Sequence, residues 1–306
     1  MSDHGSDHGS DQSPSQTSGV IHDIGYRHYD GPRLGRAAIS RALMVSSLRH
    51  AYGLGRSGRS KVMPILLLAV MVVPAAIVVG TEIGLQFDKP LIMPVDYAFL
   101  LQPVVALYLA SQAPQLFSRD LRYRSIVLYL ARPPRRTDYA LAKLAALVGA
   151  LMILIGLPLV VLYAGALLAK YNFVDTTNQL FYGLAGALLL SILLAAIGGL
   201  IAAATPRRGF AVAAIIAVLL VSFTAVVSTQ AIVNNGGNMS STAARYASLG
   251  SPFTLAQALQ TFLLRDGEGS WMPSPQQGLV FAAVYVALVA VCVGGVNARY
   301  AKVANG

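Results

Sequence analysis

The sequence predicts an all-α integral membrane protein with six transmembrane helices, and two observations support that prediction. The first is composition: of 306 residues, 55% are hydrophobic and only 12% are charged, and the mean hydropathy is +0.60. Soluble domains carry about 25% charged residues, because their surfaces face water. The second is that the apolar residues gather in long uninterrupted runs, which is typical of chains that cross a bilayer. Together these facts exclude the two soluble domains that the length alone would suggest.

Six apolar runs are long enough to be spans, since a helix needs about 20 apolar residues to cross a hydrocarbon core of about 30 Å. None of the 13 acidic residues falls inside these runs. Pro74, Pro103 and Pro158 predict kinks, which membrane helices tolerate because neighbouring helices satisfy the freed carbonyl groups. We expect the spans at about 62–80, 97–117, 139–168, 180–204, 210–233 and 278–297.

Positive charge is distributed unequally between the two sides of this predicted domain. Eighteen of the 23 Lys and Arg residues precede the first span, follow the last, or lie in the loops after the second and fourth spans. The opposite side carries Lys89, Lys170, Arg245 and Arg265. Because cytoplasmic loops are enriched in Lys and Arg, we expect a multi-pass protein of a prokaryotic plasma membrane with both termini in the cytoplasm. The net charge of +10 then reflects topology, and we expect no nucleic-acid partner.

Two segments precede the six-span domain, which we place at 62–302. Residues 1–33 form a polar tail that is too poor in apolar groups to order itself. Residues 34–61 predict an interfacial elbow helix and a basic hinge. An exposed juxtamembrane linker is the alternative for this segment. On a helical wheel one face holds Leu34, Ala37, Met44, Val45, Leu48 and Tyr52, and the other holds Arg36, Ser40, Ser47 and His50.

The glycines at 53, 55 and 58 match the pattern G-x-G-x-x-G, but a dinucleotide site needs that pattern between a strand and a helix. Here a predicted helix precedes it, so we interpret it as a flexible hinge. The sequence contains no G-x-x-x-x-G-K-[ST] motif, which would cradle ATP phosphates. All five histidines precede the first span, and Cys292 is the single cysteine. We therefore expect no catalytic, metal-binding or cofactor-binding residue on this chain and no enzymatic activity of its own.

The loop between the second and third spans, residues 118–138, is dense in arginine. Ser118 can cap a short helix that Pro133 and Pro134 must end. A basic helix with an apolar stripe is typical of a segment that docks in the groove of a partner. A lipid-facing loop that only sets topology is the alternative. The predicted docking residues are Arg119, Asp120, Arg122, Arg124, Ile126, Leu130, Arg135 and Arg136.

The longest loop, residues 234–277, contains a second short helical pattern that begins at Ser251-Pro252. The pattern is too short to span and apolar on one face, so it predicts a re-entrant or interfacial hairpin on the external side. We expect it to enter between the outer ends of the fifth and sixth spans and to form an external gate. The gate residues are Pro252, Phe253, Leu255, Leu259 and Phe262, and the polar span residues of a possible transport path are Gln102, Ser222 and Thr224.

Over about residues 35–300 the chain resembles the membrane subunit of ABC exporters, the ABC type 2 permease family. Asp120, Arg124, the stretch 128–136 and Ala142-Lys143 are similar to the acidic residue, the basic residue, the Leu-Leu-x-x-Pro-x-x-Arg pattern and the Gly-Lys pair of that family. Ser251-Pro252-Phe253 is similar to the proline turn of its external hairpin. Asp120 stands for the commoner Glu and Ala142 for Gly. These departures weaken an assignment to a subfamily.

The resemblance implies a permease that pairs with a second permease subunit, identical or paralogous, in membrane lipid. It also implies separate ABC ATPase subunits that bind ATP and Mg below the 118–138 loop. An ion-coupled transporter usually carries ionisable relay groups in its spans, and none is present at mid-depth here. An ion-coupled or passive transporter or channel remains an alternative, as does a non-transporting scaffold subunit. A membrane enzyme would need a reactive cluster at membrane depth, which the spans lack.

Overall fold

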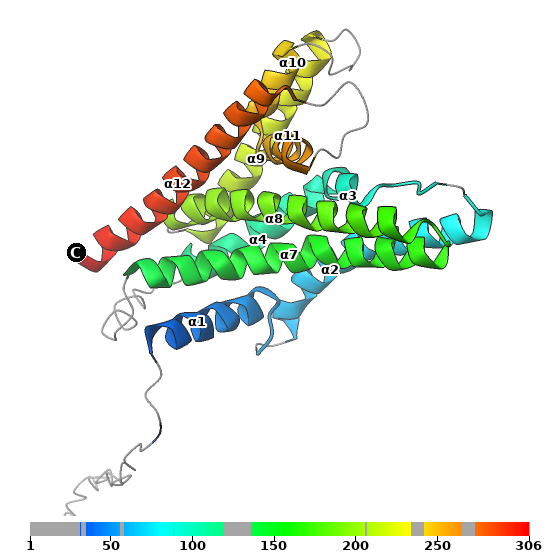
Figure 1. Ribbon diagram of the computed structural model, residues 1–306. Coiled ribbons are helices and arrows are strands. Elements are labelled where there is room, and N and C mark those ends of the chain that lie inside the picture. The colour runs from blue at the N-terminus through cyan, green and yellow to red at the C-terminus, as the bar shows by residue number, and fades with distance from the viewer. Residues whose placement is uncertain are drawn as a thin grey trace, which may run out of the picture. The chain divides into compact units, whose positions relative to one another are not determined.

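The computed structural model describes residues 31, 35–55, 58–87, 89–118, 136–205, 207–233, 242–264 and 273–305, and every structural statement below concerns these residues. The chain divides into two units, 1–34 and 35–306. The described part of the second unit contains helices and no strand (Figure 1). The helices are α1 (Arg36–Ala51), α2 (Arg59–Leu85), α3 (Pro94–Leu100), α4 (Gln102–Leu116), α7 (Arg136–Leu168), α8 (Phe173–Ala204), α9 (Arg208–Val233), α10 (Thr242–Ala247), the 3-10 helix η1 (Ser248–Gly250), α11 (Pro252–Leu264) and α12 (Pro275–Asn305).

Five of these helices, α2, α7, α8, α9 and α12, are each long and apolar enough to cross a membrane. They contain the predicted first, third, fourth, fifth and sixth spans. The prediction of an all-α membrane protein is confirmed at this level. The helices are longer than the apolar runs, because polar residues at the ends continue the helical backbone. Glu82, for example, lies within α2 although the predicted span ends at residue 80.

The predicted second span, residues 97–117, is divided between α3 and α4. The break is at Leu101, whose φ of −107° and ψ of 23° leave the helical region. Pro103 accounts for the break, since its ring nitrogen cannot donate to the carbonyl group of Phe99. With 7 and 15 residues, α3 and α4 are each shorter than a spanning helix.

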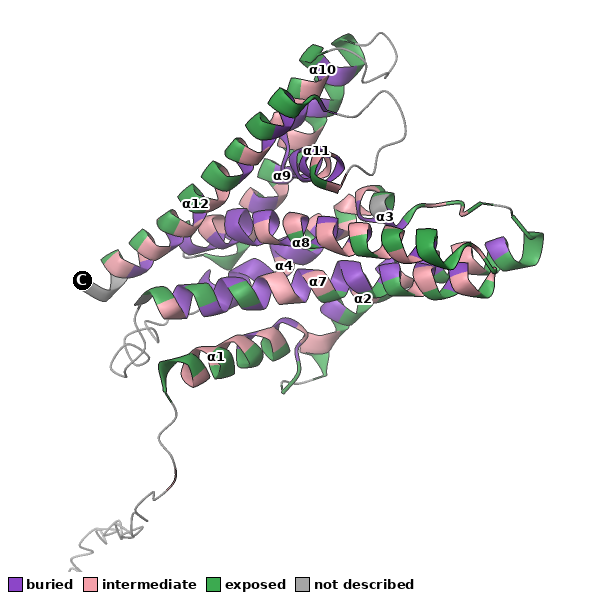
Figure 2. Ribbon diagram, in the orientation of Figure 1, coloured by how far each residue is buried: buried purple, intermediate pink, exposed green. Residues whose placement is uncertain are grey.

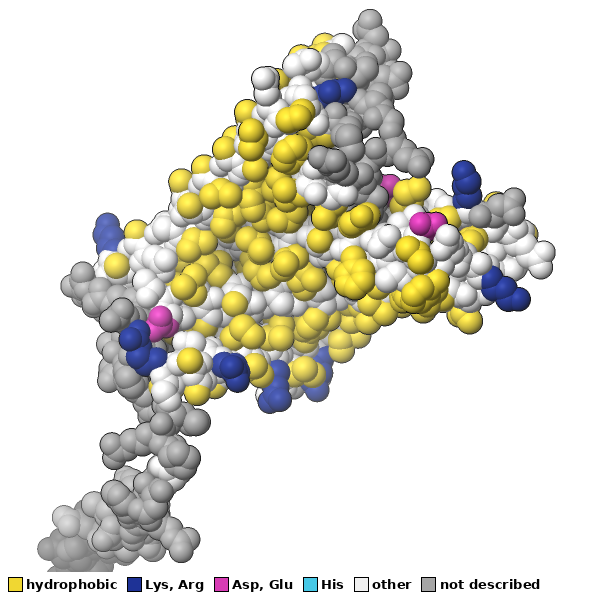
Figure 3. Space-filling view, in the orientation of Figure 1, with side chains coloured by type: hydrophobic (Ala, Val, Ile, Leu, Met, Phe, Trp, Pro, Cys, Tyr) yellow, Lys and Arg dark blue, Asp and Glu magenta, His cyan; other side chains and the backbone are white. Residues whose placement is uncertain are grey.

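Helices α7 and α8 lie side by side at the centre of the bundle (Figure 1). Helices α1 and α2 pack on α7, and α11 and α12 pack on α8. Figure 2 shows buried residues concentrated on α7, α8 and α11, whereas α9 and α12 are largely exposed. The visible face is covered by hydrophobic side chains, with Lys and Arg at its ends and along its lower edge (Figure 3). This distribution is typical of helices that face lipid tails.

Small residues allow the helices to approach closely where large side chains face them. A β-carbon at Gly198 of α8 would lie 2.8 Å from Cδ1 of Leu109 in α4, and one at Gly199 would lie 2.9 Å from Cδ2 of Leu144 in α7. Gly165 of α7 leaves room for Val79 of α2 in the same way. Close packing at small residues is a main source of helix association in membranes, because lipid tails are as apolar as the side chains.

Three helices end in the same type of backbone turn, in which a residue with positive φ follows the last helical turn. The residue is Gly53 after α1 (φ 69°), Gln86 after α2 (φ 52°) and Lys170 after α7 (φ 62°). At Lys170 both bonds of the Schellman motif form: the amide of Tyr171 donates to Ala166 and that of Lys170 donates to Leu167. The turns at Gln86 and Lys170 end α2 and α7 next to the start of α8. There the side chain of Asn172 accepts a hydrogen bond from the amide of Val174 at 3.0 Å.

Helix α1 forms where the sequence predicts it, but the face that it buries differs from the prediction. Ser47, assigned to the polar face, is only 2% exposed, whereas Val45, assigned to the apolar face, is 38% exposed. The reason is that α1 packs on α7 at small residues. The Leu48 side chain lies 3.7 Å from the β-carbon position of Gly149, and the Tyr52 hydroxyl donates to the carbonyl oxygen of Ala150 at 2.8 Å.

Candidate functional site

The segment predicted as a gate forms α11, and this helix is buried on nearly all sides. Phe253, Leu255 and Leu259 are at most 3% exposed, Pro252 is buried and Phe262 is half-buried. Helix α11 contacts α9 and α12, as predicted, but its most extensive contact is with α8 (Figure 2). The sequence pattern could not reveal α8 as a partner, because the contact depends on Gly186 in the middle of that helix.

Two buried polar side chains lie at the start of α11. Ser251 is a residue type that commonly caps a helix, but its hydroxyl makes no hydrogen bond with a described residue. The Thr254 hydroxyl instead donates to the carbonyl oxygen of Ser248 at 2.7 Å. Upstream, the Gln230 side chain donates to the Ser248 hydroxyl at 3.2 Å and joins the end of α9 to η1. The start of α11 is thereby fixed to α9 by a short chain of buried polar contacts.

A cavity of about 400 Å³ lies between α4 and α9 and is bounded by the first turn of α11. We call it the apolar cavity. Gln102 of α4, Thr224 of α9 and Phe253 of α11 all line it, together with apolar side chains that include Leu220 and Phe223. Two of the three predicted path residues and one predicted gate residue therefore share one cavity. Pockets of this size, apolar with a few polar groups, are typical binding sites for small molecules.

The polar groups of the apolar cavity differ in how they are satisfied. The Thr224 hydroxyl donates to the carbonyl oxygens of Leu220 and Val221 within its own helix. The side-chain oxygen of Gln102 is buried and accepts no hydrogen bond from a described residue. Ser222, the third predicted path residue, does not line the cavity and donates to Leu219 at 3.0 Å. Gln102 is therefore the polar group of this cavity that retains an unused acceptor.

The predicted docking residues fall largely outside the described part of the chain. These are Arg119, Asp120, Arg122, Arg124, Ile126, Leu130 and Arg135, and the same holds for the side chain of Arg136 at the first position of α7.

The structure describes the two ends of the 118–138 loop. The Ser118 hydroxyl donates to the carbonyl oxygen of Ala202 in α8 at 2.7 Å, and Asp138 pairs with Arg36 of α1 at 2.8 Å. The two ends are thus attached to two different helices.

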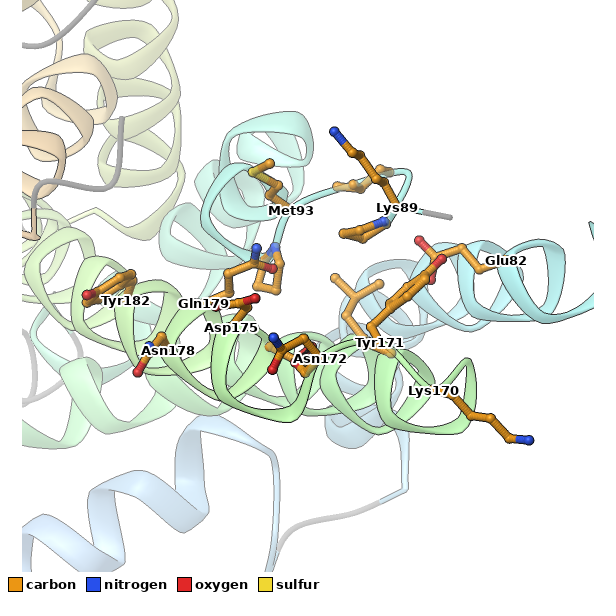
Figure 4. Close-up of a pocket in the computed structure, with 16 residues that line it drawn as sticks. Glu82, Lys89, Met93, Lys170, Tyr171, Asn172, Asp175, Asn178, Gln179 and Tyr182 are labelled. Atoms are coloured by element: carbon orange, nitrogen blue, oxygen red, sulfur yellow. Dashed lines mark hydrogen bonds between the residues drawn. The ribbon is translucent and has the colours of Figure 1, made fainter. Parts of the chain in front are cut away.

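A second cavity, of about 800 Å³, lies where α2, α3, α7 and α8 meet (Figure 4). We call it the carboxylate cavity, because Glu82 and Asp175 both line it. The sequence interpretation missed it, since its charged residues belong to the ends of different helices. The available signal was the recurrence of charged residues at 82, 89, 170 and 175, just beyond the ends of the first and third apolar runs and before the fourth.

No group of three or more His, Cys, Asp or Glu side chains that could hold a metal ion occurs within the described ranges. In comparisons with known proteins, no family model and no curated protein matches the chain.

Proposed function

We propose that the chain is the permease subunit of an ATP-driven ABC exporter. In this proposal two permease subunits form the transmembrane path, and separate ATPase subunits dock on the 118–138 loop. Helices α3 and α4 together serve as the second of six spans, α1 is the interfacial elbow helix and α11 is the re-entrant gate. The termini lie in the cytoplasm of a prokaryotic cell.

The observation that carries the proposal is the apolar cavity. It brings Gln102 and Thr224, residues predicted for the path, next to Phe253, a residue predicted for the gate. These residues come from three helices, and Gln102 lies more than 100 positions before the other two in the sequence. A wall of hydrocarbon with the amide of Gln102 and the hydroxyl of Thr224 suits an amphipathic or lipid-like cargo. A second copy or a paralogue on the α4–α9 face would enclose this cavity, and Leu220 and Val221 on α9 remain 58% and 65% exposed for that contact.

Energy enters the proposed transporter through the 118–138 loop, because the sequence has no phosphate-cradling motif of its own. A push on this loop would act on α4 and α7 directly. It would also reach α8 through the bond between Ser118 and Ala202, and α1 through the ion pair between Arg36 and Asp138. These contacts support a role of the loop as a coupling segment.

The test is ATP-dependent transport of a fluorescent phospholipid in vesicles that contain the chain and its co-purified partner. The substitution Arg122→Glu with Arg124→Glu should remove the associated, vanadate-sensitive ATPase activity. The matched control is Arg41→Glu with Arg49→Glu on α1, which makes the same charge change at two exposed arginines. If the loop variant keeps full ATP-dependent transport, the docking assignment is wrong.

A second pair of variants tests the cavity. Ala106→Trp fills it from α4 and should block transport while ATPase binding persists. Leu188→Trp places the same ring at a position on α8 that is 44% exposed, and should transport normally. Transport that follows an ion gradient without ATP would favour the ion-coupled alternative, and the absence of transport with an intact complex would favour a scaffold subunit.

A further inference from the structure

The carboxylate cavity is formed by helix ends that the turns at Gln86 and Lys170 bring together. Helix α2 contributes Glu82, the segment before α3 contributes Lys89 and Met93, and the first turns of α8 contribute Asp175 and Gln179 (Figure 4). None of its lining residues lines the apolar cavity. It is therefore a separate feature of the molecule, and the proposed transport path makes no use of it.

Glu82 is the unusual residue of this cavity, because its side chain is only 3% exposed. One carboxylate oxygen accepts a hydrogen bond from the amide of Leu91 at 2.7 Å. The other accepts none from any residue that the structure describes. Figure 4 shows the carboxylate turned toward the side chains that line the cavity. Burial of an ionised carboxylate with so few partners is unfavourable unless a positively charged group pairs with it.

Three other charged residues line the cavity around Glu82: Asp175, Lys89 and Lys170. Asp175 lies in the first turn of α8 and its carboxylate points into the cavity (Figure 4). The amino groups of Lys89 and Lys170 point away from it (Figure 4), and neither lysine forms an ion pair with a described carboxylate. Neither lysine pairs directly with Glu82, so the Glu82 carboxylate is left for a cation that enters the cavity.

The size and the walls of the cavity indicate which cation fits. Its volume of about 800 Å³ is far larger than a metal ion needs and lies in the range of pockets for organic ligands. The lining also contains apolar and aromatic side chains, among them Ile92, Pro94, Leu162 and Tyr171. Aromatic faces attract ammonium groups, and aliphatic walls accept the body of an organic molecule.

We propose that the carboxylate cavity binds an organic ammonium ion, with the amino group at Glu82 and the apolar body against Pro94 and Leu162. The exposed carboxylate of Asp175 attracts the cation to the cavity. The ammonium group belongs to a soluble amine or to the headgroup of an aminophospholipid. Both sources present the same chemistry to Glu82.

The test uses the purified full-length chain in detergent and 2-phenylethylamine as the probe, with binding measured by calorimetry. The neutral isostere 2-phenylethanol should bind at least about tenfold more weakly, because hydrogen bonds to charged groups are the stronger ones. Equal binding of the amine and the alcohol would overturn the proposal without any variant being needed. The absence of amine binding would overturn it as well.

Variants locate the site. Glu82→Gln should weaken amine binding about tenfold or more, and Asp175→Asn, an exposed position, by about threefold. Asp96→Asn is the matched control, because it removes one negative charge from an exposed residue of α3 outside the cavity lining. If Glu82→Gln fails to fold, Asp175→Asn still tests the proposal. Amine binding by Asp175→Asn that equals binding by Asp96→Asn would show that the amine does not bind in the carboxylate cavity.

The source of the ammonium group is resolved by native mass spectrometry after purification from mixed lipid. Retention of phosphatidylethanolamine over phosphatidylglycerol, reduced in Asp175→Asn, identifies the membrane as the source. Amine binding without lipid retention identifies a soluble ligand. The proposal is independent of the transport function, since loss of amine binding predicts no loss of the ATPase partner, and the loop variant described above predicts no loss of amine binding.

Discussion

The side-chain amide of Gln260 in α11 occupies the position that a β-carbon at Gly186 of α8 would fill. The amide nitrogen of Gln260 donates to the carbonyl oxygen of Tyr182 at 3.4 Å, and the residue is 5% exposed. The absence of a side chain at Gly186 therefore allows a polar side chain of α11 to reach the backbone of α8.

Gly186→Ala should displace the Gln260 amide and leave it buried without a partner. The expected loss is about 1–3 kcal/mol of unfolding free energy, measured as a lower thermal midpoint in detergent. Gly294→Ala is the control, because no heavy atom lies within 4 Å of the added carbon. Adding Gln260→Ala to Gly186→Ala should recover most of the loss, since the second change removes the obstructing amide. Additive losses would contradict the contact.

Gly53 predicts a second stability effect, at the corner between α1 and α2. Its φ of 69° disfavours any side chain, and an added β-carbon would lie 2.6 Å from the carbonyl oxygen of Ser60. Gly53→Ala should therefore cost at least about 1–2 kcal/mol. Gly55→Ala has a similar φ of 84° but no neighbouring atom within 4 Å, so it should cost less. The difference between the two variants isolates the backbone contact, and equal losses would show that the contact is unimportant.

The burial of α11 is testable by cysteine labelling. Leu259→Cys replaces a side chain that is 3% exposed, and Leu263→Cys replaces one that is 54% exposed on the same helix. Only the cysteine at 263 should react rapidly with a maleimide in detergent. If α11 is a gate, nucleotide and the ATPase partner should change the labelling rate at 259, and Leu259→Asp should transport poorly. Fast labelling at 259 in every state would leave α11 as an ordinary exposed segment.

Membrane orientation is testable with an impermeant maleimide on intact cells. From the asymmetry of Lys and Arg, Ser240→Cys should react from outside and Ser15→Cys should react only after the membrane is opened. Reversed labelling of the two positions would invert the topology, whereas labelling of both from outside would show an even number of spans between them instead of the expected five.

Much of the helical framework was predictable, because a run of about 20 apolar residues has few other stable outcomes. The break at Leu101 was less predictable, since Pro103 signals a kink without fixing its size. The buried face of α1 was predicted wrongly at Ser47 because helix packing favours small residues as well as apolar ones. A helical wheel scores only the apolar residues.

The two cavities also show that single residues were predictable from the sequence while their spatial grouping was not. The sequence identified Gln102, Thr224 and Phe253 as unusual members of apolar or short helical segments, but it did not reveal that they line one cavity. Glu82 and Asp175 were not predicted as a pair, because they meet only through the turns at Gln86 and Lys170. Those turns use Gln and Lys where glycine is usual, so no sequence signal marked them.

The dependence of α2 on α7 has a consequence for biosynthesis. Helix α2 ends at residue 85, whereas α7, its principal partner, begins at residue 136. The ribosome therefore completes α2 well before α7. Until α7 arrives, α2 has to remain in the bilayer through its own hydropathy. With the N-terminus in the cytoplasm, as proposed, Glu82 crosses to the far side before the surroundings of its carboxyl group exist. Insertion of α2 is thus decided by its apolar length, and the carboxyl group of Glu82 gains its neighbours only when α7 and α8 have been made.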